Sequence, residues 1–126
     1  MITKPATVFI IDDDVSLRRA LTRLVHSAGM EPQPYPGATE FLQADLSSER
    51  ACVVSDIRMN GMNGLELHRA LKEAGLLLPV IFVTAHDTEE TRAQAKSQGA
   101  VAYFRKPVDD QALLDAIDWA LSGSEN

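Results

Sequence analysis

The sequence alternates five times between a short segment typical of a strand and a segment in which apolar residues recur at helical spacing. The expected strands are residues 7–11, 31–35, 52–54, 80–83 and 101–104, and the expected helices cover about 17–28, 38–44, 67–74, 88–98 and 113–121. Strands that alternate with helices predict a parallel sheet with helices on both faces and right-handed crossovers. The alternation therefore predicts an α/β fold.

Individual segments indicate how the strands lie in this sheet. Residues 7–11 are almost entirely apolar, as expected of a strand that is covered on both faces. Pro32 and Pro34 lack the N–H of a sheet hydrogen bond, so they confine the second strand to an edge. Since no repeat or internal boundary is visible, we expect one domain over residues 1–121, and then a small polar tail, 122–126, that is typical of a linker.

Composition excludes several classes of function. Twelve basic and eighteen acidic residues give a net charge of −6, whereas nucleic acids and anionic membranes require a basic face. No apolar stretch approaches the roughly 18 residues of a membrane span, and the N-terminus lacks the pattern of a signal peptide. We therefore expect a cytoplasmic protein that binds neither membrane nor, through this segment, nucleic acid. Cys52 is the only cysteine and lies in an apolar segment, which predicts a buried thiol.

Polar side chains follow four of the predicted strands, at the point where each strand ends. In an open parallel sheet, ligands bind beyond these carboxyl ends, near the place where the strand order reverses. The order of the chain therefore brings several acids, a hydroxyl and an ammonium group to one edge. In chain order they are Asp12, Asp13, Asp14, Asp56, Thr84 and Lys106.

This set of groups suits phosphoryl transfer. Carboxylates that gather at one edge repel one another and raise each other's pKa, and a hard cation such as Mg²⁺ relieves that repulsion. A carboxylate can also act as a nucleophile and form an aspartyl phosphate. A lysine then supplies a point charge for phosphate oxygen, and a threonine supplies a hydrogen-bond donor. Phosphoryl transfer needs this positioning and charge neutralisation more than covalent help.

Each of these residues also has a simpler interpretation when it is taken alone. The run of aspartates could start a helix, Asp56 could belong to a turn, and Thr84 could cap the next helix. A single lysine such as Lys106 is usually solvated, and Tyr103 is more often a core residue. Their coincidence at one predicted edge favours the functional interpretation, and we keep the cap only for Asp14.

Four motifs in fixed order resemble those of response-regulator receiver domains. They are residues 10–13 (IIDD), 55–64 (SDIRMNGMNG), 83–85 (VTA) and 104–107 (FRKP). The resemblance runs from about residue 6 to residue 121, and the sequence of the second motif is most similar to that of FixJ-type regulators. It implies a single doubly wound, flavodoxin-like (βα)5 domain whose five-stranded parallel sheet has the order 2-1-3-4-5.

The resemblance also implies a role for each motif residue. Asp56 would accept a phosphoryl group from a histidine kinase. Asp13 would bind Mg²⁺ directly, Asp12 would assist, and Asp56 and the backbone carbonyl of Arg58 would complete the protein ligands. Lys106 would pair with an acceptor or phosphate oxygen.

The remaining implied roles concern switching. Pro107 would follow a cis peptide bond. Thr84 would move to bond the phosphate, and Tyr103, at the switch-aromatic position, would rotate in response. A phosphorylation-dependent homodimer would then form through the fourth helix, fifth strand and fifth helix. The sequence departs from the family pattern at Asn60, where proline is usual, and Asn-Gly favours a tight turn there.

Three functions remain as alternatives. The first is a signalling module, not an enzyme in its own right. Its output is either transcription, through a DNA-binding domain that follows in FixJ-type proteins and is absent from this sequence, or that of a single-domain regulator. The second is an aspartyl-phosphate enzyme that turns over external phosphoesters, but the chain has no insertion for a substrate cap. The third is an FMN carrier, in which the acidic residues 12–14 would repel the FMN phosphate.

Overall fold

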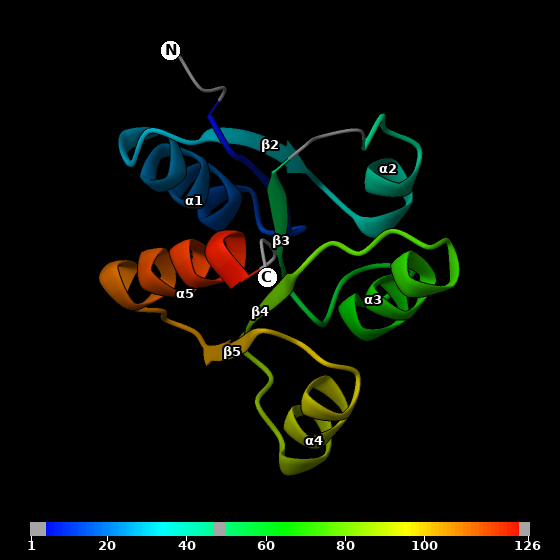
Figure 1. Ribbon diagram of the computed structural model, residues 1–126. Coiled ribbons are helices and arrows are strands. Elements are labelled where there is room, and N and C mark those ends of the chain that lie inside the picture. The colour runs from blue at the N-terminus through cyan, green and yellow to red at the C-terminus, as the bar shows by residue number, and fades with distance from the viewer. Residues whose placement is uncertain (1–4, 47–49, 124–126) are drawn as a thin grey trace.

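A computed structural model describes residues 5–46 and 50–123, in which five strands alternate with five helices (Figure 1). The elements are β1 Thr7–Ile11, α1 Val15–Ser27, β2 Glu31–Tyr35, α2 Ala38–Leu42, β3 Ala51–Ser55, α3 Gly64–Glu73, β4 Val80–Thr84, α4 Glu89–Ser97, β5 Ala102–Arg105 and α5 Asp110–Gly123. All ten predicted segments are present. Ser122 and Gly123, which we assigned to the tail, end α5, and residues 124–126 lie outside the described residues.

The predicted helices 67–74 and 113–121 both begin three residues too late. Helix α3 begins at Gly64 because Asn63 caps it, and Glu66 bonds back to the Asn63 backbone. Helix α5 begins at Asp110, and the Asp109 carboxylate accepts a hydrogen bond from Ala112 N at 2.9 Å. Apolar periodicity marks only the buried part of a helix, whereas polar caps fix its first residue.

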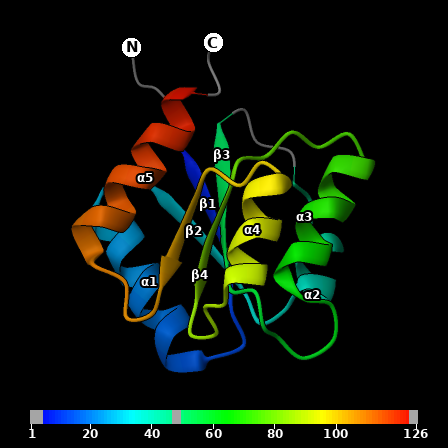
Figure 2. The ribbon, with the colours of Figure 1, turned by 90° about the horizontal axis from the view of Figure 1, so that it is seen from below.

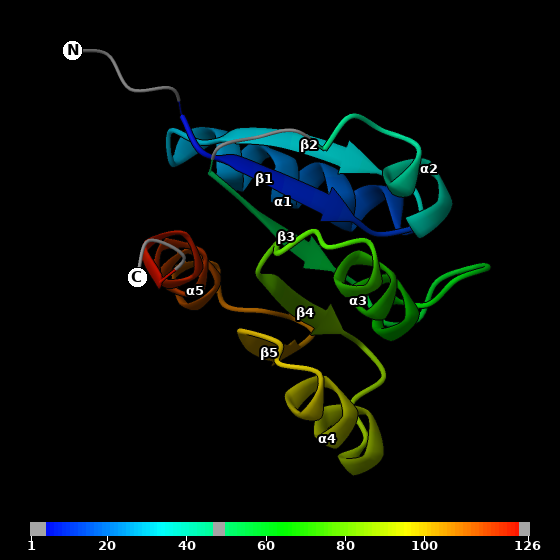
Figure 3. The ribbon, with the colours of Figure 1, turned by 45° about the vertical axis from the view of Figure 1, so that its right-hand side comes forward.

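The strands form one parallel sheet in the order β2-β1-β3-β4-β5, which confirms the predicted order. Figure 3 shows the arrows of the sheet running in a common direction. From β1 the chain moves outward to β2 and then returns past β1 to β3, so the order reverses between β1 and β3. The carboxyl ends of these two strands therefore frame the crevice in which such folds bind ligands.

Helices cover both faces of the sheet. Helices α1 and α5 lie on one face and α2, α3 and α4 on the other (Figures 1 and 2). Alternate residues of each central strand enter the two cores: in β1, Val8 and Ile10 pack with α1 and α5, whereas Phe9 and Ile11 pack with α2 and α3. Burial on both faces explains why the central strands are apolar without alternation.

The outer position of β2 confirms the prediction made from its prolines. Glu31 N donates to Ala6 O at 2.8 Å, and Tyr35 O accepts from Asp12 N at 3.2 Å, so the odd-numbered residues of β2 face β1. Neighbouring residues of a strand direct their backbone groups to opposite sides. The ring nitrogens of Pro32 and Pro34 therefore face away from the sheet, where no partner strand needs their N–H.

Two features that we expected from composition are also visible. Cys52 is fully buried in β3, which confirms the predicted buried thiol, and burial raises the pKa of this thiol to about 12. Among the helices of the described part of the chain, none combines the length and apolar character needed to cross a bilayer.

Candidate functional site

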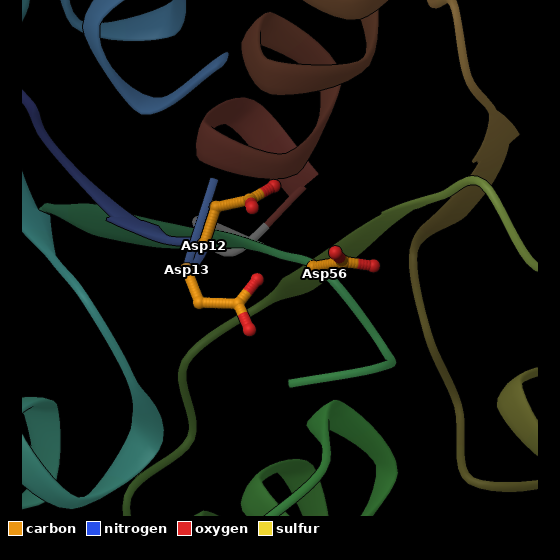
Figure 4. Close-up of side chains that lie close together, drawn as sticks. All are labelled: Asp12, Asp13 and Asp56. Carbon is orange, nitrogen blue, oxygen red and sulfur yellow. The ribbon is translucent and has the colours of Figure 1, made fainter. Parts of the chain in front are cut away.

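The reversal of strand order brings three carboxylates together. In the sheet, Ile11 of β1 lies opposite Ser55 of β3, so the residues that follow them leave the sheet side by side. One oxygen from each of Asp12, Asp13 and Asp56 lies within 4.8 Å of the others, and Figure 4 shows the three side chains close together. The predicted acidic cluster is thus present at the predicted edge.

The cluster fits a hard divalent cation. Asp12 and Asp56 are buried, whereas Asp13 is exposed, so the cluster opens to solvent on the side of Asp13. Carboxylate oxygens with room for water are the ligands that Mg²⁺ prefers. The side chain of Arg58 contacts His86, with Nη1 of Arg58 3.1 Å from Nδ1 of His86. The role of the Arg58 carbonyl as a metal ligand stays a prediction.

Lys106 reaches the same cluster from the end of β5. Its Nζ donates to Oδ2 of Asp12 at 3.0 Å and to Oδ2 of Asp56 at 3.1 Å. Burial alone lowers the pKa of Lys106, but the hydrogen bonds and charges of the two carboxylates outweigh it and raise the pKa above its ordinary value. The ammonium group beside Asp56 is therefore charged at neutral pH. The peptide bond between Lys106 and Pro107 is cis, as predicted.

Asp12 is held in place by several partners. Its Oδ1 accepts from Asp14 N at 2.9 Å, and Arg18 Nη1 donates to its backbone oxygen at 2.6 Å. Burial raises the pKa of Asp12, while the Asp14 amide and Lys106 oppose this effect, and the charge of Asp56 adds the smallest contribution. The predicted repulsion by Asp56 therefore does raise the pKa of Asp12, but burial, which the sequence did not indicate, is the larger cause.

The carboxylate of Asp56 is oriented through both oxygens. Oδ1 accepts from Ile57 N at 2.7 Å, and Oδ2 accepts from Lys106. Ser55 Oγ donates to the backbone oxygen of Asp56 at 2.8 Å, and Gly64 N donates to Ile57 O at 2.7 Å. Hydrogen bonds therefore hold the backbone at Asp56 and at Ile57, and the bonds to both of its oxygens fix the direction of the Asp56 side chain.

Two of the simpler interpretations can now be decided. Asp14 is the N-cap of α1, and its carboxylate accepts from Leu17 N at 3.2 Å, as we expected. Thr84 does not cap the next helix, because the N-cap of α4 is Thr88. Thr84 is fully buried at the end of β4, and its hydroxyl oxygen accepts from His86 N at 3.1 Å. The Thr84 hydroxyl is thus bonded to the loop that follows β4.

Tyr103 has a hydrogen-bond partner that the sequence does not indicate. The phenol of Tyr103 donates to Oδ1 of Asp87 at 3.1 Å, and Arg92 pairs with Asp87 and lies over the tyrosine ring. Burial and the bond to Asp87 raise the pKa of Tyr103 to about 12, so the phenol stays protonated. This contact joins β5 to the loop that follows Thr84. No sequence pattern marks Asp87, because it lies 16 positions from Tyr103.

Comparison with known proteins agrees with this geometry. Residues 8–118 match the model of the response regulator receiver domain family. The transcriptional regulatory protein TdiR of Thauera aromatica is 42% identical over 93% of this chain and 52% of its own length. The transcriptional regulatory protein FixJ of Azorhizobium caulinodans is 36% identical over 93% of this chain and 56% of its own length. The chain thus spans about half the length of the curated relatives it matches.

Solved structures show the same relation. The response regulator StyR superimposes with a TM-score of 0.88 and 38% identity over 96% of this chain and 61% of that chain. The structure of FixJ-N superimposes with a TM-score of 0.85 and 30% identity over 97% of this chain and 96% of that chain. The match of the family model to most of the sequence confirms the predicted resemblance. The chain belongs to the response regulator receiver domain family.

Proposed function

We propose that this receiver domain accepts a phosphoryl group on Asp56 from a histidine kinase in a reaction that depends on Mg²⁺. Receiver domains are signalling domains that interact with histidine kinases and bind Mg²⁺ at an acidic pocket. The observation that carries the proposal is that Asp56 is bonded to the Lys106 ammonium and clusters with the carboxylates of Asp12 and Asp13. That a histidine kinase is the phosphoryl donor of this chain, and that the protein is cytoplasmic, stay predictions.

In the proposed reaction, the phosphoryl group moves from a histidine of the kinase to Asp56. An Asp56 oxygen attacks the phosphorus of a phosphohistidine as the bond between phosphorus and the imidazole nitrogen breaks, and the imidazole takes a proton from solvent. Lys106 already bridges Asp12 and Asp56, so its charge lies where negative charge increases. Asp12, Asp13 and Asp56 would hold a Mg²⁺, whose charge would neutralise the phosphate oxygens.

One experiment separates the three functions that the sequence leaves open. The protein is incubated with acetyl phosphate and Mg²⁺, and its intact mass is recorded. A signalling module should gain a single phosphoryl group and turn over little further substrate. Repeated turnover of several phosphoesters would instead indicate an aspartyl-phosphate enzyme, and yellow colour would indicate a bound flavin. A protein that gains no phosphoryl group would contradict the proposal.

Mg²⁺ is expected to raise the free energy of unfolding. The folded chain gathers three carboxylates that the unfolded chain separates, so the cation binds the folded state. At about a hundredfold excess of Mg²⁺ over its dissociation constant, the gain should be about 2–3 kcal/mol. Asp13→Ala should remove most of this gain, and Asp14→Ala, beside it in sequence but engaged in capping, should keep it. Thermal melts with and without Mg²⁺ provide the measurement, and an equal gain in both variants would place the metal elsewhere.

We also propose that phosphorylation acts through Thr84 and Tyr103. A phosphoryl group on Asp56 would attract the Thr84 hydroxyl, which now accepts from His86 N, and would draw the loop after β4 inward. The same loop carries Asp87, the partner of the Tyr103 phenol. Movement of the loop would therefore release or redirect the aromatic ring. Helix α4 buries only Ala95, so its packing is the easiest to shift.

The expected output of this switch is a homodimer through α4, β5 and α5. Differential contacts of a few kcal/mol are enough to make a minor state the major one. Light scattering with Mg²⁺, before and after addition of beryllofluoride, should show monomer and then dimer. Thr84→Ala should stay monomeric, whereas the surface variant Ser27→Ala, on α1 and outside this face, should dimerise like wild type. A monomer in both states would refute the dimer, and a dimer that forms unaltered in Thr84→Ala would refute the coupling.

Control of transcription is a proposal for the whole protein. TdiR and FixJ are named as transcriptional regulatory proteins, and this chain matches about half of each. We infer that the dimer would act through a DNA-binding domain outside the present sequence. An acidic chain with a net charge of −6 supports the view that DNA is not bound by the receiver domain itself.

A further inference from the structure

The Asn60 backbone amide contacts the exposed acid of the cluster. Asn60 N donates to Oδ2 of Asp13 with a nitrogen-to-oxygen distance of 3.3 Å. The bond joins the loop after β3 to the loop after β1, across 47 positions of sequence. Residues 60–62 form a bend, in which Gly61 has a φ of 83°.

With this bond, each acid of the cluster accepts a hydrogen bond from a backbone amide. Asp12 accepts from Asp14 N at 2.9 Å and Asp56 from Ile57 N at 2.7 Å, and the Asn60 amide gives Asp13 the equivalent bond. Asp12 and Asp56 are buried and also bonded to Lys106, so their directions are fixed twice. Asp13 is exposed, so its side chain has the most freedom to lose when it binds a cation.

We propose that the Asn60 backbone amide is a positioning group that orients the Asp13 carboxylate for a divalent cation. The bond occupies Oδ2 and leaves Oδ1 free for the metal, because a carboxylate has two oxygens. An acid that is oriented before binding has less conformational entropy to lose. The inference rests on the proposed function, since it assigns a role within the same Mg²⁺ site.

The chemical nature of the donor makes the inference specific. The N–H belongs to the main chain, so every residue except proline supplies it. Asn60→Pro thus removes the donor, whereas Asn60→Ala removes the side chain and keeps the donor. The two variants separate the role of the amide from that of the asparagine side chain.

The test is the Mg²⁺ dissociation constant of the unphosphorylated protein, measured by isothermal titration calorimetry. Asn60→Ala should bind within about twofold of wild type, and Asn60→Pro should bind about three- to fivefold more weakly, the range expected for one modest hydrogen bond. Equal affinities for the two variants, or tighter binding by Asn60→Pro, would overturn the inference. Wild type that binds no Mg²⁺, or Asp13→Ala that binds like wild type, would instead refute the proposed metal site.

A second measurement does not depend on how the proline variant folds. Amide hydrogen exchange of Asn60 is compared in metal-free wild type and metal-free Asp13→Ala. The Asn60 amide should exchange several-fold faster in Asp13→Ala, while the Glu66 amide, which is bonded to the Asn63 side chain, should be unchanged. An Asn60 amide with the same rate in both proteins would show that the bond has no role in solution, and the inference would be wrong.

Discussion

The Asp56→Asn variant is expected to accept no phosphoryl group while it keeps the wild-type fold. Asparagine matches aspartate in shape, and its amide oxygen can still accept from Ile57 N, as Oδ1 of Asp56 does at 2.7 Å. The amide nitrogen, however, is not a nucleophile that forms an acyl phosphate, and it carries no charge for Lys106 to pair with. The mass after treatment with acetyl phosphate and Mg²⁺ should therefore stay that of the unmodified chain.

A matched control uses another acid of the same edge. Asp14→Asn changes one carboxylate to an amide, but Asp14 caps α1 and does not join the acidic cluster. Because asparagine caps helices as well as aspartate does, this variant should fold and gain a phosphoryl group like wild type. Asp56→Asn that still gains a phosphoryl group would show that the acceptor lies elsewhere. Circular dichroism and melting curves establish that both variants are folded.

The Gly64→Ala variant is expected to unfold at a much lower temperature and to be phosphorylated poorly. A Cβ at Gly64 would lie 2.2 Å from the Asp56 backbone oxygen and 3.0 Å from Ile57 Cα. These are backbone atoms, so the loop itself must move. We expect a loss of about 3 kcal/mol of stability, which outweighs the gain of about 1 kcal/mol from a better helix former. For a domain of this size the melting temperature should fall by about 10 °C.

Gly61→Ala in the same loop provides the comparison. A Cβ at Gly61 meets no atom within 4 Å, and the strain comes only from its φ of 83°. The expected loss is about 1 kcal/mol, with phosphorylation retained. Differential scanning calorimetry and the rate of labelling by acetyl phosphate distinguish the variants. If the two substitutions lower stability equally and leave labelling intact, the close approach at Gly64 does not position Asp56.

The fold could be predicted from the sequence because burial leaves a clear pattern. The central strands are covered on both faces, so residues such as Val8 and Phe9 are apolar together. The outer strand was recognisable through Pro32 and Pro34, since proline excludes a partner on one side. The first residues of the helices were harder to predict. The start of α3 depends on Asn63 and Glu66, which act through hydrogen bonds and add nothing to apolar periodicity.

The candidate site was predictable wherever strand order alone decides proximity. Asp12, Asp13 and Asp56 meet because parallel strands end at one edge, and Lys106 follows by the same rule. Contacts made by side chains or amides from different loops were not predictable. The Asp87 bond to Tyr103 and the Asn60 bond to Asp13 depend on loop conformation, which the residue types do not fix.

The placement of prolines on β2 also governs how these molecules meet in a crowded cell. A sheet with a free edge can grow by pairing with another chain, and unguarded edges lead to fibres or disordered aggregates. At the β2 edge the outward nitrogens of Pro32 and Pro34 carry no hydrogen, so an approaching strand would find acceptors without the alternating donors that it needs. Unwanted association is thereby blocked on this side. A regulated encounter can then be confined to the opposite edge of the sheet, where β5 lies.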